Sequence, residues 1–193
     1  MHEMNEKYVP YRGYDAPYIF VSYAHKDGNK ASEVIEKLQM EQYRVWYDEG
    51  IDPGTEWDEN IAEHIENCEY FIALLSREYL VSSNCKDELN FARELEKPRL
   101  LIYLEDIQLP GGMRMRLSRL QAIHKYKYQS MELFFEKLAE TQGLEKCHEK
   151  QKQEKTIIIE STELSIMEGI RTHGSTGQYG KGTAQSSRFA VEE

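Results

Sequence analysis

The residues best suited to chemistry lie in the segment Ser82-Ser83-Asn84-Cys85-Lys86-Asp87-Glu88-Leu89. It follows the apolar run Tyr70-Phe71-Ile72-Ala73-Leu74-Leu75, which is typical of a strand buried on both faces. The segment is therefore expected at the carboxyl end of a strand, the edge of an open α/β sheet where ligands bind. A carboxylate at Glu88 could stabilise positive charge that develops on a bound ligand. The residues alone are also compatible with a structural acid near a helix start, kept ionised by the helix dipole.

Composition excludes several classes of function. The chain of 193 residues has 24 Lys and Arg against 34 Asp and Glu, for a net charge of −10. Such an acidic chain is a poor general nucleic-acid binder, because phosphate contacts need clustered cations. No run reaches the roughly 18 apolar residues of a membrane span, and no leader segment is expected. We predict a soluble protein of a reducing, cytoplasmic compartment. Neither a disulfide framework nor a metal site is expected from the spacing of Cys68, Cys85 and Cys147.

Strand and helix patterns alternate along the chain. Strands are predicted at 18–23, 44–48, 69–75, 99–104 and 121–126. Helices are predicted at 31–42, from 55 past Ile65, at 76–80, at 85–95, at 113–120 and at 131–141. This alternation predicts an α/β fold, a flavodoxin-like open parallel five-stranded sheet with helices on both faces. The order of the strands does not follow from the pattern.

The chain divides into three parts by composition. Residues 1–16 are an extended N-terminal lead-in, and residues 17–146 form one domain. Residues 147–193 are predicted to be a mostly irregular tail, because they are polar and rich in Gly, Ser, Thr and Gln with little to bury. The β-branched run Thr156 to Glu160 is the exception, and could add to a sheet edge or to another chain.

Four segments occur in an order typical of one family. They are Phe20-Val21-Ser22-Tyr23, then Val45-Trp46-Tyr47-Asp48 with Pro53-Gly54, then the G-x-x-W-x-x-x-I pattern from Gly54 to Ile61, and finally S-x-x-C-x-x-E-L from Ser82 to Leu89. Over residues 18–140 the chain thus resembles the TIR (Toll/interleukin-1 receptor) domains, in particular the bacterial NAD-cleaving type. One departure is Asn84, where many bacterial and plant members have a Trp beside the substrate.

The resemblance implies roles for particular residues. In the enzymatic members the glutamate of the last segment is the catalytic carboxylate, which here is Glu88. NAD would be the substrate, with no cofactor. The expected substrate-binding residues are Tyr23, His25, Asp48, Trp57, Ser83 and Asn84, and the expected self-association loop contains Asp52, Pro53 and Gly54. Structural alternatives stay open for several of these: a capped loop for Tyr23 and His25, a core anchor for Trp57 and a loop cap for Asp48.

The function implied by the resemblance is cleavage of the nicotinamide–ribose bond of NAD by a glycohydrolase or ADP-ribosyl transfer enzyme. Its context would be bacterial antiphage immune signalling, with self-association and an effector protein that responds to the product. No nucleic acid or membrane is expected as a partner. The alternative is a non-catalytic adaptor that works by homotypic TIR–TIR association. A nucleotide-binding flavodoxin-like regulator is a third option, but no Ser/Thr-rich phosphate loop follows the first strand.

Overall fold

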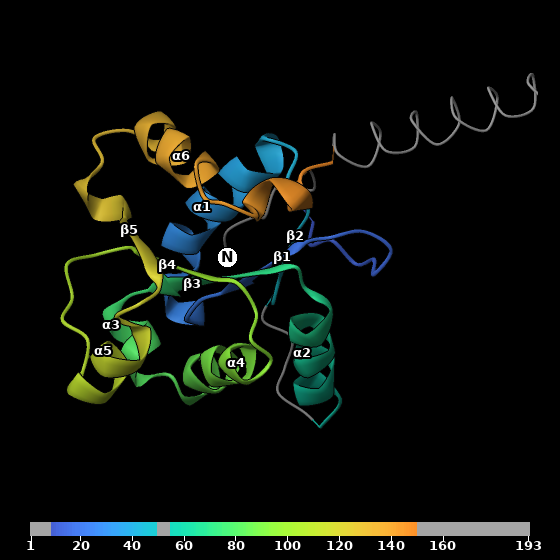
Figure 1. Cartoon of the computed structure of the whole chain (residues 1–193), viewed down its shortest axis with the longest axis horizontal. Coiled ribbons are helices and arrows are strands. Elements are labelled where there is room, and N and C mark those ends of the chain that lie inside the picture. Colours follow the sequence, from blue (N-terminus) through green and yellow to red (C-terminus); the bar gives the residue numbers. More distant parts are fainter. Residues whose placement is uncertain (1–8, 50–54, 150–193) are drawn as a thin grey trace, which may run out of the picture. The chain divides into compact units, whose positions relative to one another are not determined.

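The computed structural model describes residues 9–49 and 55–149, with side chains from residue 59 onward in the second range. Its centre is a parallel sheet of five strands in the order β2-β1-β3-β4-β5 (Figure 1). The strands are β1 Ile19–Ser22, β2 Val45–Tyr47, β3 Tyr70–Leu75, β4 Arg99–Tyr103 and β5 Gln121–His124. This is the flavodoxin-like order. After β2 is added on one side of β1, the later strands are added on the other side, so the topological switch point lies between β1 and β3. The predicted fold class is confirmed.

Helices cover both faces of the sheet. The α-helices are α1 Gly28–Met40, α2 Thr55–Asn67, α3 Arg77–Val81, α4 Ser83–Glu94, α5 Gly111–Leu117 and α6 Met131–Ala139. Three short 3-10 helices are η1 His25–Asp27, η2 Lys125–Lys127 and η3 Leu144–Cys147. Helices α1 and α6 lie on one face, while α2, α4 and α5 lie on the other (Figure 1). Within the described ranges, no helix is long and apolar enough to cross a membrane.

The apolar strands supply two cores at once. In β3, Tyr70, Ile72 and Leu74 pack toward α1 and α6, whereas the alternate residues of the strand pack toward α2 and α4. Successive side chains of a strand point to opposite faces, so a strand covered on both faces is apolar throughout. Every residue of β3 is accordingly buried. A rigid central strand of this kind fixes the positions of the loops that leave its carboxyl end.

The domain extends further than its predicted boundary. Cys147 is fully buried, and its carbonyl oxygen accepts a hydrogen bond from the Arg44 backbone N–H at 3.0 Å. The Glu149 N–H donates to the Gln42 carbonyl at 2.9 Å. The predicted boundary after residue 146 therefore cuts through packed chain, and residues 147–149 belong to the domain. The predictions for the rest of the tail, Thr156 to Glu160 included, concern residues outside the described ranges.

Candidate active site

Glu88 lies in the second turn of α4, and two serines that cap helices fix the path of the chain before it. Ser76 caps α3, and Ser82 ends α3 and caps α4, with its Oγ accepting a hydrogen bond from the Cys85 N–H at 3.3 Å. Cys85 is buried in the core. Because residues three apart share a helix face, Glu88 follows Cys85 toward the sheet. Its Oε2 accepts a hydrogen bond from Ser22 Oγ, at the carboxyl end of β1, at 2.6 Å.

The environment of Glu88 disfavours its charge. Burial raises the pKa of the Glu88 carboxyl from 4.5 to about 7. The hydrogen bond from Ser22 acts in the opposite direction, while the negative charges of Asp48 and Asp87 raise the pKa further. The predicted effect of the helix dipole is therefore outweighed, and the pKa rises instead of falling. The residue lies beyond the first turn, where the dipole acts, and desolvation dominates.

A cleft of about 400 Å³ opens beside Glu88. Five of the predicted site residues line it, namely Tyr23, His25, Ser83, Asn84 and Glu88. They come from the end of β1, from η1 and from the first two turns of α4. Across the cleft, Lys26 forms an ion pair with Glu78 at 3.0 Å. The predicted residues thus meet at the carboxyl edge of the sheet, although they are far apart in the sequence.

Asp48 contacts two of the residues that line this cleft. Its Oδ2 lies 2.7 Å from His25 Nε2, and its backbone carbonyl accepts a hydrogen bond from the Tyr23 hydroxyl at 2.8 Å. Burial raises the pKa of Tyr23, so this phenol stays protonated and acts as a donor. The predicted residues Trp57, Asp52, Pro53 and Gly54 lie outside the part of the chain whose side chains are described.

A second, more apolar cleft of about 300 Å³ lies between α2 and α4. Ile61 and Ile65 of α2 and Phe91 of α4 provide its apolar wall. Asn84 and Glu88 line both clefts, so the carboxylate stands at their junction. This arrangement could receive a ligand that carries both a sugar and an aromatic ring.

Comparison with known proteins identifies the family. The sequence model described as TIR domain matches residues 19–139. The chain belongs to the TIR domain family. In structure it is similar to the TIR domain of the Toll-related receptor TRR-2 from Hydra magnipapillata, with a TM-score of 0.53 and 19% identity, over 63% of this chain and 94% of that one. No curated protein gives a significant match.

Two further solved structures are similar at lower TM-scores. The Clostridium botulinum CMP N-glycosidase BcmB matches with a TM-score of 0.48 and 18% identity, over 63% of this chain and 97% of that one. A 2-deoxyribosyltransferase from Leishmania mexicana matches with a TM-score of 0.39 and 18% identity, over 65% of this chain and 99% of that one.

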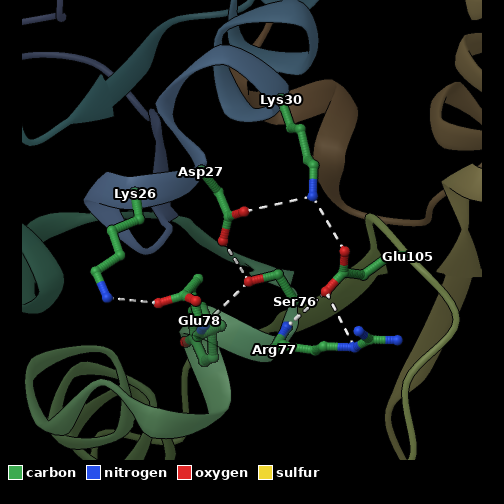
Figure 2. Close-up of polar contacts among 8 residues, drawn as sticks. Lys26, Asp27, Lys30, Ser76, Arg77, Glu78 and Glu105 are labelled. Carbon is green, nitrogen blue, oxygen red and sulfur yellow. Dashed lines mark hydrogen bonds and ion pairs between the residues drawn. The ribbon is translucent and has the colours of Figure 1, made fainter.

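A polar network ties together three loops at the carboxyl edge of this TIR domain (Figure 2). The buried Asp27 accepts a hydrogen bond from Ser76 Oγ and lies 3.5 Å from Lys30 Nζ. Lys30 also pairs with Glu105 at 3.0 Å, and Glu105 accepts a hydrogen bond from the Arg77 backbone N–H at 2.9 Å. The network therefore joins η1, the start of α3 and the end of β4, and it fixes the wall of the cleft opposite α4.

Sequence reasoning missed two polar residues next to Glu88 in this TIR domain. Ser22 was seen only as part of the first-strand motif, yet it donates to the carboxylate. Tyr79 was assigned to a short helix, yet its hydroxyl lies 3.0 Å from Ser22 Oγ and donates to the Cys85 carbonyl at 3.0 Å. A serine that ends an apolar strand was an available signal. Nothing in the sequence pattern indicates that Tyr79 turns back toward it.

Neither a cysteine nucleophile nor a metal site is supported by the residues that the structure describes. Burial raises the pKa of the Cys85 thiol to about 12, so little of the nucleophilic thiolate form exists near neutrality. No group of three or more His, Cys, Asp or Glu side chains there is arranged to hold a metal ion.

Proposed function

We propose that this TIR domain cleaves the nicotinamide–ribose bond of NAD, with Glu88 as the catalytic carboxylate. The observation that carries the proposal is a desolvated glutamate, oriented by Ser22, at the junction of two clefts. The volumes of these clefts fall within the range of about 300–1,000 Å³ that is usual for small-molecule sites. The TIR family includes NAD-cleaving enzymes and non-catalytic adaptors, so the family alone does not choose between them.

The proposed reaction needs little more than a well-placed negative charge. The bond between ribose C1′ and the pyridinium nitrogen breaks, and its electron pair neutralises the ring nitrogen of the departing nicotinamide. Positive charge then develops on the ribose, where an ionised Glu88 stabilises it and holds the ribose hydroxyls. Water attacks C1′ and releases one proton. With a pKa of about 7, Glu88 is able to accept that proton.

The walls of the two clefts suit the two halves of this task. Tyr23, His25 and Ser83 offer hydrogen-bonding groups for the ribose and phosphates in the polar cleft. Ile61 and Phe91 offer an apolar surface for an aromatic ring in the second. Asn84 replaces the bulky Trp of many relatives and leaves the ribose more open on one side. We therefore expect water or another nucleophile to reach C1′, which favours hydrolysis or an adduct over cyclisation.

We further propose that the activity serves antiphage immune signalling, with self-association completing the site. The resemblance supports this context, since the loop containing Pro53 contacts a neighbouring subunit in related proteins. An effector protein would respond to the product. The adaptor alternative assigns the same surfaces to association alone and leaves Glu88 without a chemical task.

The deciding experiment is incubation of the purified full-length protein with NAD at low and high protein concentration. Nicotinamide and ADP-ribosyl products are resolved by chromatography and mass spectrometry. Glu88→Gln should abolish nicotinamide release while retaining the folded circular dichroism spectrum. The matched control is Glu94→Gln, at an exposed position of the same helix, which should keep wild-type turnover. Near wild-type turnover in folded Glu88→Gln, or intact NAD after prolonged incubation of assembled protein, would leave the adaptor alternative.

A further inference from the structure

Glu88 is the end of a buried chain of hydroxyl groups. Ser22 Oγ lies 2.6 Å from Glu88 Oε2 and 3.0 Å from the Tyr79 hydroxyl oxygen. The Tyr79 hydroxyl lies 3.0 Å from the Cys85 carbonyl oxygen, to which it can only donate. Ser22 and Tyr79 are almost completely buried, with exposed fractions of 1% and 0%. Water therefore has little access to either hydroxyl, and the protons in the chain can be counted.

The count depends on the charge of Glu88. The chain has three contacts, and each needs one donated proton. The two hydroxyls supply only one proton each, so an ionised Glu88 leaves one contact without a proton. A protonated Glu88 supplies the third. Glu88 then donates to Ser22, Ser22 donates to Tyr79, and Tyr79 donates to the Cys85 carbonyl.

We propose that Tyr79, Ser22 and Glu88 form a hydrogen-bond relay, a chain in which every contact carries a proton only when Glu88 is protonated. Tyr79 is then a positioning residue, which acts through Ser22 and favours the neutral form of the Glu88 carboxyl before substrate binds. The inference rests on the proposed function for the role of Glu88. The relay itself can be measured without NAD.

Other charged or titratable groups lie around Glu88, and two of them, Asp48 and Asp87, raise its pKa. They come from every element packed against it: Asp48 after β2, Tyr23 at the end of β1, His25 and Lys26 in η1, Glu78 in α3, and Cys85 and Asp87 in α4. None of these side chains takes part in the chain of three contacts, which meets Cys85 only at its backbone carbonyl. A change confined to the Tyr79 hydroxyl therefore isolates the relay from this background.

The test is the pKa of Glu88, measured by carboxyl ¹³C NMR on the full-length protein. Tyr79→Phe removes two contacts from the neutral state and one from the ionised state. The pKa of Glu88 should therefore fall by about 0.5 to 1, the equivalent of one hydrogen bond. In a Ser22→Ala background, Tyr79→Phe should cause no further change, because the chain is already broken. The control Tyr18→Phe removes another buried hydroxyl, which donates to the His64 carbonyl, and should leave the Glu88 pKa unchanged.

A second measurement needs no substitution in the relay. In the wild-type protein the Tyr79 Cζ resonance should shift with the same midpoint as Glu88, and the Tyr18 resonance should not. Three results would each overturn the relay. They are an unchanged or higher Glu88 pKa in Tyr79→Phe, an equal pKa shift in the Ser22→Ala background, and a Tyr79 resonance that does not change as Glu88 titrates. Full NAD turnover in Glu88→Gln would overturn the proposed function instead, so the two failures are distinguishable.

Discussion

The desolvation of Glu88 predicts that this residue destabilises the folded protein above neutral pH. The folded state raises its pKa from 4.5 to about 7, so the folded protein binds this proton more tightly than the unfolded chain does. Stability linked to Glu88 is then fully present below pH 4.5 and is lost as the pH rises through about 7. Linkage over this window gives a loss of about 2.5 kcal/mol between pH 5 and pH 8.

Glu88→Gln should remove this dependence, because glutamine keeps the shape of the side chain and cannot ionise. Relative to wild type, the variant should gain about 2.5 kcal/mol more stability at pH 8 than at pH 5. In a domain of this size that corresponds to an extra rise in melting temperature of about 5–10 °C at pH 8. Urea unfolding followed by circular dichroism at both pH values measures the difference directly.

The matched control is again Glu94→Gln, on the same helix at an exposed position. It should change the free energy of unfolding by the same small amount at both pH values. A stability difference between Glu88→Gln and wild type that stays constant from pH 5 to pH 8 would refute the reasoning. It would mean that Glu88 titrates alike in the folded and unfolded states.

Three further predictions concern activity and assembly. Because the proposed reaction uses the ionised carboxylate, kcat/KM should rise with pH around a midpoint of about 7. A flat profile across that range would exclude Glu88 titration from the reaction. Truncation after Glu149 should preserve cooperative unfolding. Truncation after Lys146 should lower the free energy of unfolding by about 3 kcal/mol, because it removes a buried side chain and several hydrogen bonds. Equal stability of the two truncated proteins would show that residues 147–149 add nothing. Specific activity should rise with protein concentration, and Pro53→Asp or Gly54→Arg should suppress that rise; concentration-independent turnover would contradict self-association.

The fold was predictable because its determinants are local in the sequence. An apolar run such as Tyr70 to Leu75 reports a strand buried on both faces, and the alternation of runs with helical stripes reports a parallel sheet. The strand order was not predictable, since it depends on packing between elements. The C-terminal boundary was placed early for a similar reason. The residues around Cys147 are polar and give no sign that the Cys147 side chain is buried. Nor do they indicate the two backbone hydrogen bonds that this segment forms with Gln42 and Arg44.

The site was predictable only in part. The motif located Glu88, and parallel strands bring Tyr23 and His25 to the same edge of the sheet. The direction of the Glu88 pKa shift does not follow from the sequence, because a helix-dipole argument uses position in the helix and ignores burial. The contacts of Ser22 and Tyr79 depend on how α3 folds back against β1, which no spacing in the sequence encodes.

The energetics of Glu88 bear on the choice between enzyme and adaptor. A protein that acts only through its surfaces gains nothing from a desolvated carboxyl, and Gln or Leu at this position would give a more stable domain near neutrality. A catalyst gains from the same feature, since a partly desolvated negative charge stabilises a ribosyl cation more strongly than one in bulk solvent. Approach of the positively charged nicotinamide ring would lower the pKa of Glu88 and ionise it where the charge is needed. The destabilising position of Glu88 therefore fits the enzyme better than the adaptor.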